Sequence, residues 1–188
     1  MRSVVVSVSA LVCVAVTGAS VAEPEIRLRE DTYPVIADSW RAAYNQVMYR
    51  QWAAGGAAET STEWTLDYRY RPSEGRCELY DYTLVLDIVV LLPEWENAAR
   101  ASASDQQRWQ TLRTHLRDHE HRHIEIALEG TEEMERAIAA VRSEPDCTRL
   151  RDALETTKLR VMDRIEGRQN TYDRRTDHGQ RDLSRLSD

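Results

Sequence analysis

Apolar and polar positions first recur at helical spacing over residues 35–52. The residues that share one helical face there are Ile36, Trp40, Tyr44 and Val47. Strict alternation follows over residues 62–70, and residues 78–92 are rich in aromatic and β-branched side chains as far as Pro93. These patterns predict one helix and then two strands, joined by a turn at residues 72–75. The second strand is apolar on both faces, so we expect it to lie centrally in a sheet that helices cover on one side.

A longer stretch with apolar residues at steps of three or four predicts a second, long helix. Ser102 and Ser104 each offer a helix start, the latter with the spacing of a capping box. The inward positions are Trp109, Leu112, Leu116, His119, His123, Ala127, Gly130, Met134, Ala137 and Val141. Pro145 closes this helix, and Asp146 is placed to cap another whose apolar stripe reaches about Gly167. The two helices should form an antiparallel hairpin.

The N-terminus has the pattern of a signal peptide. Arg2 precedes a short apolar run over residues 4–16, and small residues up to Ala22 place the cleavage site before Glu23. The run is shorter than the about 20 residues that span a bilayer. We therefore expect no stable membrane insertion after cleavage, and a location in the periplasm or outside the cell.

Length and charge narrow the class of protein further. Residues 1–22 would be removed, 23–180 would form a single domain, and 181–188 would be a polar C-terminal tail. The chain has 25 basic and 32 acidic residues, a formal net charge of −7. An acidic protein is a poor partner for nucleic acid, and the basic residues near the C-terminus alternate with acids as on a solvated helix face. The sequence does not specify an oligomeric state.

The cysteines predict one disulfide bond. Cys13 lies in the signal peptide, which leaves Cys77 and Cys147 in the exported chain. A single pair in an oxidising compartment favours a bond between the two.

The segment from His119 to His123 reads His-Glu-His-Arg-His and matches the motif H-E-x-x-H. Two histidines four residues apart on a helix project to the same side and can bind one zinc ion, Zn²⁺. Glu120 then lies beside the open coordination position, where it can act as catalytic base. His119 and His123 also occupy inward positions, where a purely structural helix would carry leucine or alanine.

The same histidines are also compatible with a structural role or with a different metal geometry. A pair of core histidines that only hydrogen-bond to neighbours would leave Glu120 between them unexplained. His115 extends the same stripe, so a metal shared by His115 and His119 is a competing geometry. His121 points to the other side of the helix and is expected to be exposed to solvent.

A catalytic zinc site needs a third protein ligand. In a hairpin that turns near Pro145, the residue level with His123 on the returning helix is about Gly167, because both helices rise about 1.5 Å per residue. The chain would leave the helix there, beside the metal. His178 is the first choice as third ligand and Asp173 the second. Tyr172 is a candidate catalytic donor to the oxyanion, with simple packing on the hairpin as the alternative.

These motifs resemble a bacterial family of predicted secreted zinc-dependent proteases that is classed as a domain of unknown function. The shared features are H-E-x-x-H in a long helix, a preceding strand that ends in Leu-Pro-Glu-Trp, a later cysteine, and Tyr-Asp-x-x-Thr-x-His-Gly over residues 172–179. Together they are more specific than H-E-x-x-H alone, and they cover nearly all of the mature chain. The resemblance implies His119 and His123 as ligands, Glu120 as catalytic, and a role for residues 172–179.

Better-characterised metalloprotease patterns do not fit. Ile126 and Glu129 stand where the metzincin motif has glycine and histidine. A glutamate on the following helix would suit a gluzincin, but Glu155 falls beside the apolar stripe and is interpreted as an exposed acid. His178 and Asp173 therefore remain the two candidates.

The sequence as a whole predicts a zincin-like α+β domain. A small antiparallel sheet should pack on the long helix that bears H-E-x-x-H. The expected function is a periplasmic or secreted zinc metalloprotease that hydrolyses peptide or protein substrates with Glu120 and a zinc-activated water. The alternative is an exported zinc-binding or envelope interaction protein with no hydrolytic activity.

Overall fold

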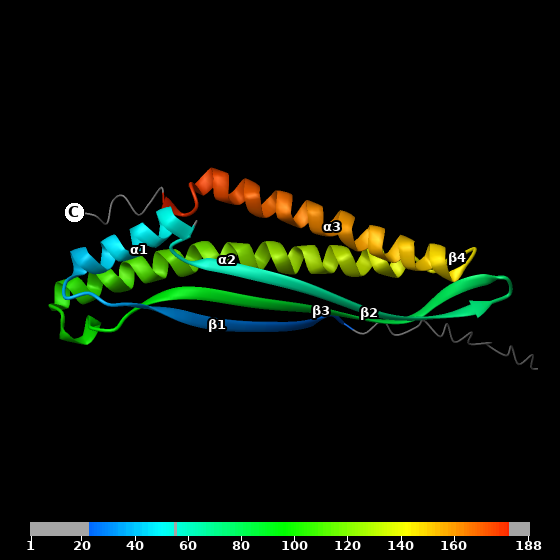
Figure 1. The fold of residues 1–188 in the computed structure, drawn as a ribbon, viewed down its shortest axis with the longest axis horizontal. Coiled ribbons are helices and arrows are strands. Elements are labelled where there is room, and N and C mark those ends of the chain that lie inside the picture. The colour runs from blue at the N-terminus through cyan, green and yellow to red at the C-terminus, as the bar shows by residue number, and fades with distance from the viewer. Residues whose placement is uncertain (1–22, 55, 181–188) are drawn as a thin grey trace, which may run out of the picture.

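The computed structural model describes residues 23–54 and 56–180. Its elements are β1 (Glu25–Val35), α1 (Trp40–Ala54), β2 (Glu59–Ser73), β3 (Arg76–Trp95), the short 3-10 helix η1 (Ala98–Arg100), α2 (Ala103–Ala140), β4 (Ser143–Glu144) and α3 (Cys147–Thr176). The predicted signal peptide and C-terminal tail lie outside these residues. None of the helices in the described ranges has an apolar stretch that could span a membrane. The predicted α+β class is confirmed, with α2 and α3 running along one face of an elongated sheet (Figure 1).

The sheet is mixed, so the prediction of a purely antiparallel sheet was wrong. Its order is β1-β3-β2, and β4 adds a short pairing to β3. The β2–β3 pair is antiparallel, with Glu59 opposite Leu91, and β3 is central as predicted. β1, however, runs parallel to β3, with Glu25 opposite Val85. β1 was not predicted because most of its side chains are exposed, and an exposed edge strand carries little hydrophobic pattern.

The helices form the predicted hairpin, but the start of α1 and the end of α3 differ from the prediction. α1 begins at Trp40, because the residues up to Val35 belong to β1. α2 begins after Ser102, one of the two predicted starts, whose side chain accepts a hydrogen bond from the backbone of Asp105 at 3.2 Å. Asp146 caps α3 as predicted. That helix then continues well past residue 167 to residue 176, because one glycine costs a helix only about 1 kcal/mol and packing outweighs it.

Two buried tryptophans fix the sheet against α2. The indole nitrogen of Trp64 on β2 donates to Thr131 Oγ1 on α2 at 2.8 Å. Trp95 at the end of β3 packs edge-on against Trp109 at 5.8 Å between ring centroids. Both Trp95 and Trp109 are almost fully buried. These contacts hold the first residues of β2 beside the middle of α2, where the H-E-x-x-H motif lies.

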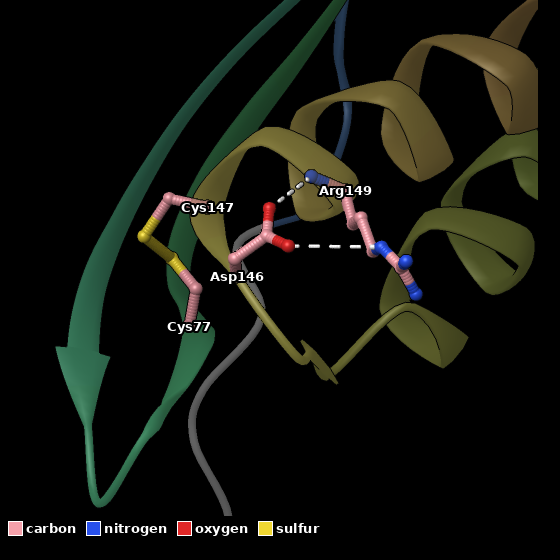
Figure 2. The surroundings of a disulfide bond; sticks show 4 residues. All are labelled: Cys77, Asp146, Cys147 and Arg149. Atoms are coloured by element: carbon pink, nitrogen blue, oxygen red, sulfur yellow. Dashed lines mark hydrogen bonds and ion pairs between the residues drawn. A yellow bond between two sulfur atoms is a disulfide. The ribbon is translucent and has the colours of Figure 1, made fainter.

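The predicted disulfide is present and joins the sheet to the second long helix. Cys77 and Cys147 are bonded, with 4.9 Å between their Cα atoms and a sequence separation of 70 residues (Figure 2). The bond lies next to Asp146, the N-cap of α3 (Figure 2). A disulfide of this kind is typical of proteins in oxidising compartments.

The close approach of α2 and α3 requires a glycine at position 130. A Cβ there would lie 2.4 Å from Cγ1 of the buried Ile165, a distance that forces a shift. We expect Gly130→Ala to lower the free energy of unfolding by about 1–3 kcal/mol through overpacking. Gly167→Ala is the matched control, because no atom lies within 4 Å and alanine favours the helix by about 1 kcal/mol. Urea unfolding measures both, and equal stability of the two variants would contradict the prediction.

Candidate metal centre

Three side chains from the two long helices converge on one point. The Nε2 atoms of His119 and His123 are 3.2 Å apart. Oδ1 of Asp173 on α3 lies 3.0 Å from Nε2 of His123 and 3.3 Å from Nε2 of His119. Ligands 2.0–2.1 Å from a tetrahedral zinc ion lie about 3.4 Å from one another, so this triangle fits zinc closely. In the part of the chain that the structure describes, it is the one group with metal-ligand geometry.

Gln169 orients the second histidine. Its side-chain amide nitrogen donates to the backbone oxygen of His123 at 3.0 Å, and its amide oxygen contacts His123 Nδ1. An amide oxygen only accepts, so Nδ1 carries the proton. The lone pair of Nε2 therefore points toward Asp173 and His119. This is the outer-shell arrangement that fixes a ligating imidazole.

The ring of His119 packs against Tyr172 and Gly179. The ring of Tyr172 stacks on it at 4.9 Å between centroids with an interplanar angle of 21°. Gly179 also approaches closely, since a Cβ there would lie 3.1 Å from His119 Cγ. Burial lowers the pKa of His119 to about 4, and His123 acts in the same direction. The imidazole is thus neutral at neutral pH, as a metal ligand must be.

Glu120 is buried beside the ligand cluster and accepts a hydrogen bond from the sheet. Its side chain is held by Thr60 on β2, whose hydroxyl donates to Glu120 Oε2 at 2.7 Å. Burial raises the pKa of Glu120, and the Thr60 hydroxyl partly offsets this effect. A carboxyl group whose pKa moves toward neutrality is suited to accept a proton and release it again.

A cavity of about 210 Å³ adjoins the cluster. Its walls come from Gln51 of α1, from residues 56–60, which lead into β2, from α2, and from the end of α3 and the turn after it. Glu120, His119, His123, Asp173 and His178 all line it. The candidate ligands and the candidate base therefore face the same space.

The two candidates for third ligand occupy different positions. Asp173, the second choice, lies in the cluster because α3 remains helical and places residues 169 and 173 on the side that faces His123. His178, the first choice, lies in the turn after α3. Its Nδ1 is 3.9 Å from Asp173 Oδ1, and its side chain is 55% exposed.

The remaining candidates lie outside the cluster. His115 Nε2 is 2.9 Å from the backbone oxygen of Gly179, which explains its place on the stripe without a metal. His121 is exposed beside Glu125, as expected. Glu155 lies near Tyr68 of β2, where burial raises the pKa of the tyrosine and the charge of Glu155 adds to this effect. Tyr172 packs on His119, which is the packing role predicted as its alternative, and it does not line the cavity.

Thr60 and Gln169 support the site but were not found from the sequence. No motif marks Thr60, because the packing of α2 against the sheet brings Thr60 to Glu120, 60 residues away in the sequence. The position of Gln169 beside His123 could have been predicted approximately, because the hairpin geometry placed Gly167, two residues earlier, level with His123. Its role depends on α3 continuing as a helix.

Comparison with known proteins gives a family but no activity. Residues 30–179 match the family described as "Bacterial protein of unknown function (DUF922)". No curated protein and no solved structure matches the chain. The family match spans most of the chain, including both long helices and the whole ligand cluster. The chain therefore belongs to the DUF922 family of bacterial proteins of unknown function.

Proposed function

We propose that the protein is an exported zinc-dependent peptidase. The observation that carries this proposal is the convergence of His119, His123 and Asp173 to within 3.3 Å of one another, beside the buried Glu120. When bound there, zinc supplies an activated water and polarises a carbonyl group. Glu120 would accept a proton from the attacking water and pass it to the leaving amine nitrogen.

The edge of the sheet supports a peptide as substrate. Among the described strands β2 pairs only with β3, so its other edge has unpaired backbone groups. Its first residues, Glu59 and Thr60, line the cavity, and Thr60 contacts the candidate base. An extended peptide that adds to this edge would pass the ligand cluster, with backbone hydrogen bonds giving affinity for many sequences.

The proposed location is the periplasm or the extracellular space. The disulfide between Cys77 and Cys147 is consistent with an oxidising compartment. The N-terminal sequence pattern of a signal peptide supports the same location.

Metal analysis of the purified protein tests the proposal directly. We expect about one zinc per chain after dialysis, and His123→Ala should lose it because only two ligands remain. His121→Ala is the matched control, since His121 lies on the same helix but is 67% exposed and outside the cluster. Loss of zinc from both variants, or its absence from zinc-treated wild type, would count against the site.

Cleavage of β-casein, an unstructured protein, by the zinc-loaded wild type then tests peptidase activity.

A further inference from the structure

The turn after α3 has an unusual backbone. Asp177, His178 and Gly179 have φ angles of 54°, 51° and 76°. Residues other than glycine rarely adopt this left-handed region, and each costs about 1 kcal/mol or more. Such conformations persist only where surrounding contacts enforce them, and they cluster at functional sites.

Contacts from both long helices hold this turn in place. The backbone nitrogen of His178 donates to the oxygen of Asp173 at 2.9 Å. On the α2 side, His115 Nε2 donates to the oxygen of Gly179 at 2.9 Å, and Gly179 lies against the ring of His119. The turn is therefore built onto the ligand cluster itself, since it is tied to one ligand by hydrogen bonding and to another by packing.

This anchored turn presents the imidazole of His178 to the cavity. His178 lines the same space as Glu120 and the three ligands. Among the described residues its ring makes no hydrogen bond, and its Nδ1 lies 3.9 Å from Asp173 Oδ1. The ring is half-exposed and lies outside the metal-ligand group. The cluster has three ligands without it, which is the usual number in a catalytic zinc site.

We propose that His178 is a catalytic residue that donates an N–H hydrogen bond to the oxygen of the scissile carbonyl as negative charge develops there. The inference rests on the proposed peptidase function. Tyr172, the other candidate donor, is stacked on His119 and is not among the residues that line the cavity. His178 is thus the better placed of the two to meet a substrate.

His178 would act in the step in which water attacks the scissile carbonyl group. The water oxygen bonds to the carbonyl carbon, the π electrons of the C=O bond move to its oxygen, and Glu120 takes a proton from the water. His178 hydrogen-bonds that oxygen and keeps its own proton. The C–N bond then breaks as the carbonyl re-forms, and Glu120 gives the proton to the amine nitrogen.

The test compares wild type with His178→Ala, using a synthetic peptide that spans a bond cleaved in β-casein. We expect kcat to fall by about 10²- to 10³-fold, as when one oxyanion donor is removed, with KM within about twofold. Zinc should remain at about one per chain. His178→Gln restores an N–H donor and should recover part of the loss. His121→Ala, which removes an exposed histidine from α2, should match wild type.

Each contrary outcome overturns the inference in a distinguishable way. Loss of zinc from His178→Ala would make His178 a ligand, and full activity with zinc retained would show that it has no catalytic role. An inactive, zinc-loaded wild type would instead overturn the peptidase function on which the inference depends. Calorimetry with a phosphinic analogue of the peptide gives a second readout without turnover. His178→Ala should weaken binding of this tetrahedral mimic about 10-fold or more, and unchanged binding would contradict the role.

Discussion

Glu120→Gln is expected to lower kcat for peptide hydrolysis by about 10³- to 10⁴-fold, toward the upper end of what a general acid–base group contributes. The amide has nearly the same shape and can still accept the hydrogen bond from Thr60, which measures 2.7 Å in the native protein. It cannot take a proton from water at neutral pH. Because burial disfavours the charged carboxylate, the neutral amide should leave the fold intact. Steady-state kinetics on the β-casein peptide and metal analysis measure the two effects.

The zinc content separates a chemical effect from a structural one. Glu120→Gln should keep about one zinc per chain, because Glu120 is not among the three clustered ligands. Glu125→Gln is the matched control: Glu125 lies on the same helix, but its side chain is 44% exposed and pairs with Arg122. Equal activity of Glu120→Gln and wild type would contradict the mechanism. A zinc-loaded wild type with no activity would favour the alternative of an exported zinc-binding protein.

The sequence predicted those parts of the fold in which one face of an element is buried. The stripe of α2 could be predicted because most of its inward positions, such as Leu112 and Met134, are buried. β3 could be predicted because its second half is apolar on both faces and largely buried. β1 was not, since its residues Ile26 and Leu28 are 43% and 59% exposed and the next residues on the same face, Glu30 and Thr32, are polar. Without β1, the predicted sheet was purely antiparallel.

Part of the candidate site is local in the sequence and could be predicted, and part depends on a second, distant helix. His119, Glu120 and His123 belong to one motif on one helix, so helical geometry alone predicts their arrangement. The choice between the two candidates for third ligand depends on where α3 ends. A helix that stopped near Gly167 would leave residues 172–179 as a loop and give His178 and Asp173 similar access. The observed helix continues to Thr176, which places Asp173 in the cluster and His178 in the turn beyond the helix.

Removal of the disulfide by Cys77→Ala with Cys147→Ala should lower the free energy of unfolding by about 4 kcal/mol. The bond closes a segment with a sequence separation of 70 residues, and the chain-entropy estimate for a loop of that size is about 4 kcal/mol. In a domain of this length the loss corresponds to a fall in Tm of about 10 °C. Urea unfolding and thermal scans at a fixed zinc concentration measure both quantities.

The same variant shows whether stability and metal binding are separable. Cys147 begins α3 and Asp173 lies near its other end, about 40 Å away along the helix axis, and Figure 1 places β4 and the far end of α3 well apart along the molecule. Zinc affinity at 25 °C should therefore match wild type within about twofold, because the ligands remain fixed by Gln169, Tyr172 and the turn at Gly179. If zinc binding weakened with stability, the disulfide would be shown to position the ligands as well. If the midpoint of unfolding did not change, the bond would contribute no stability.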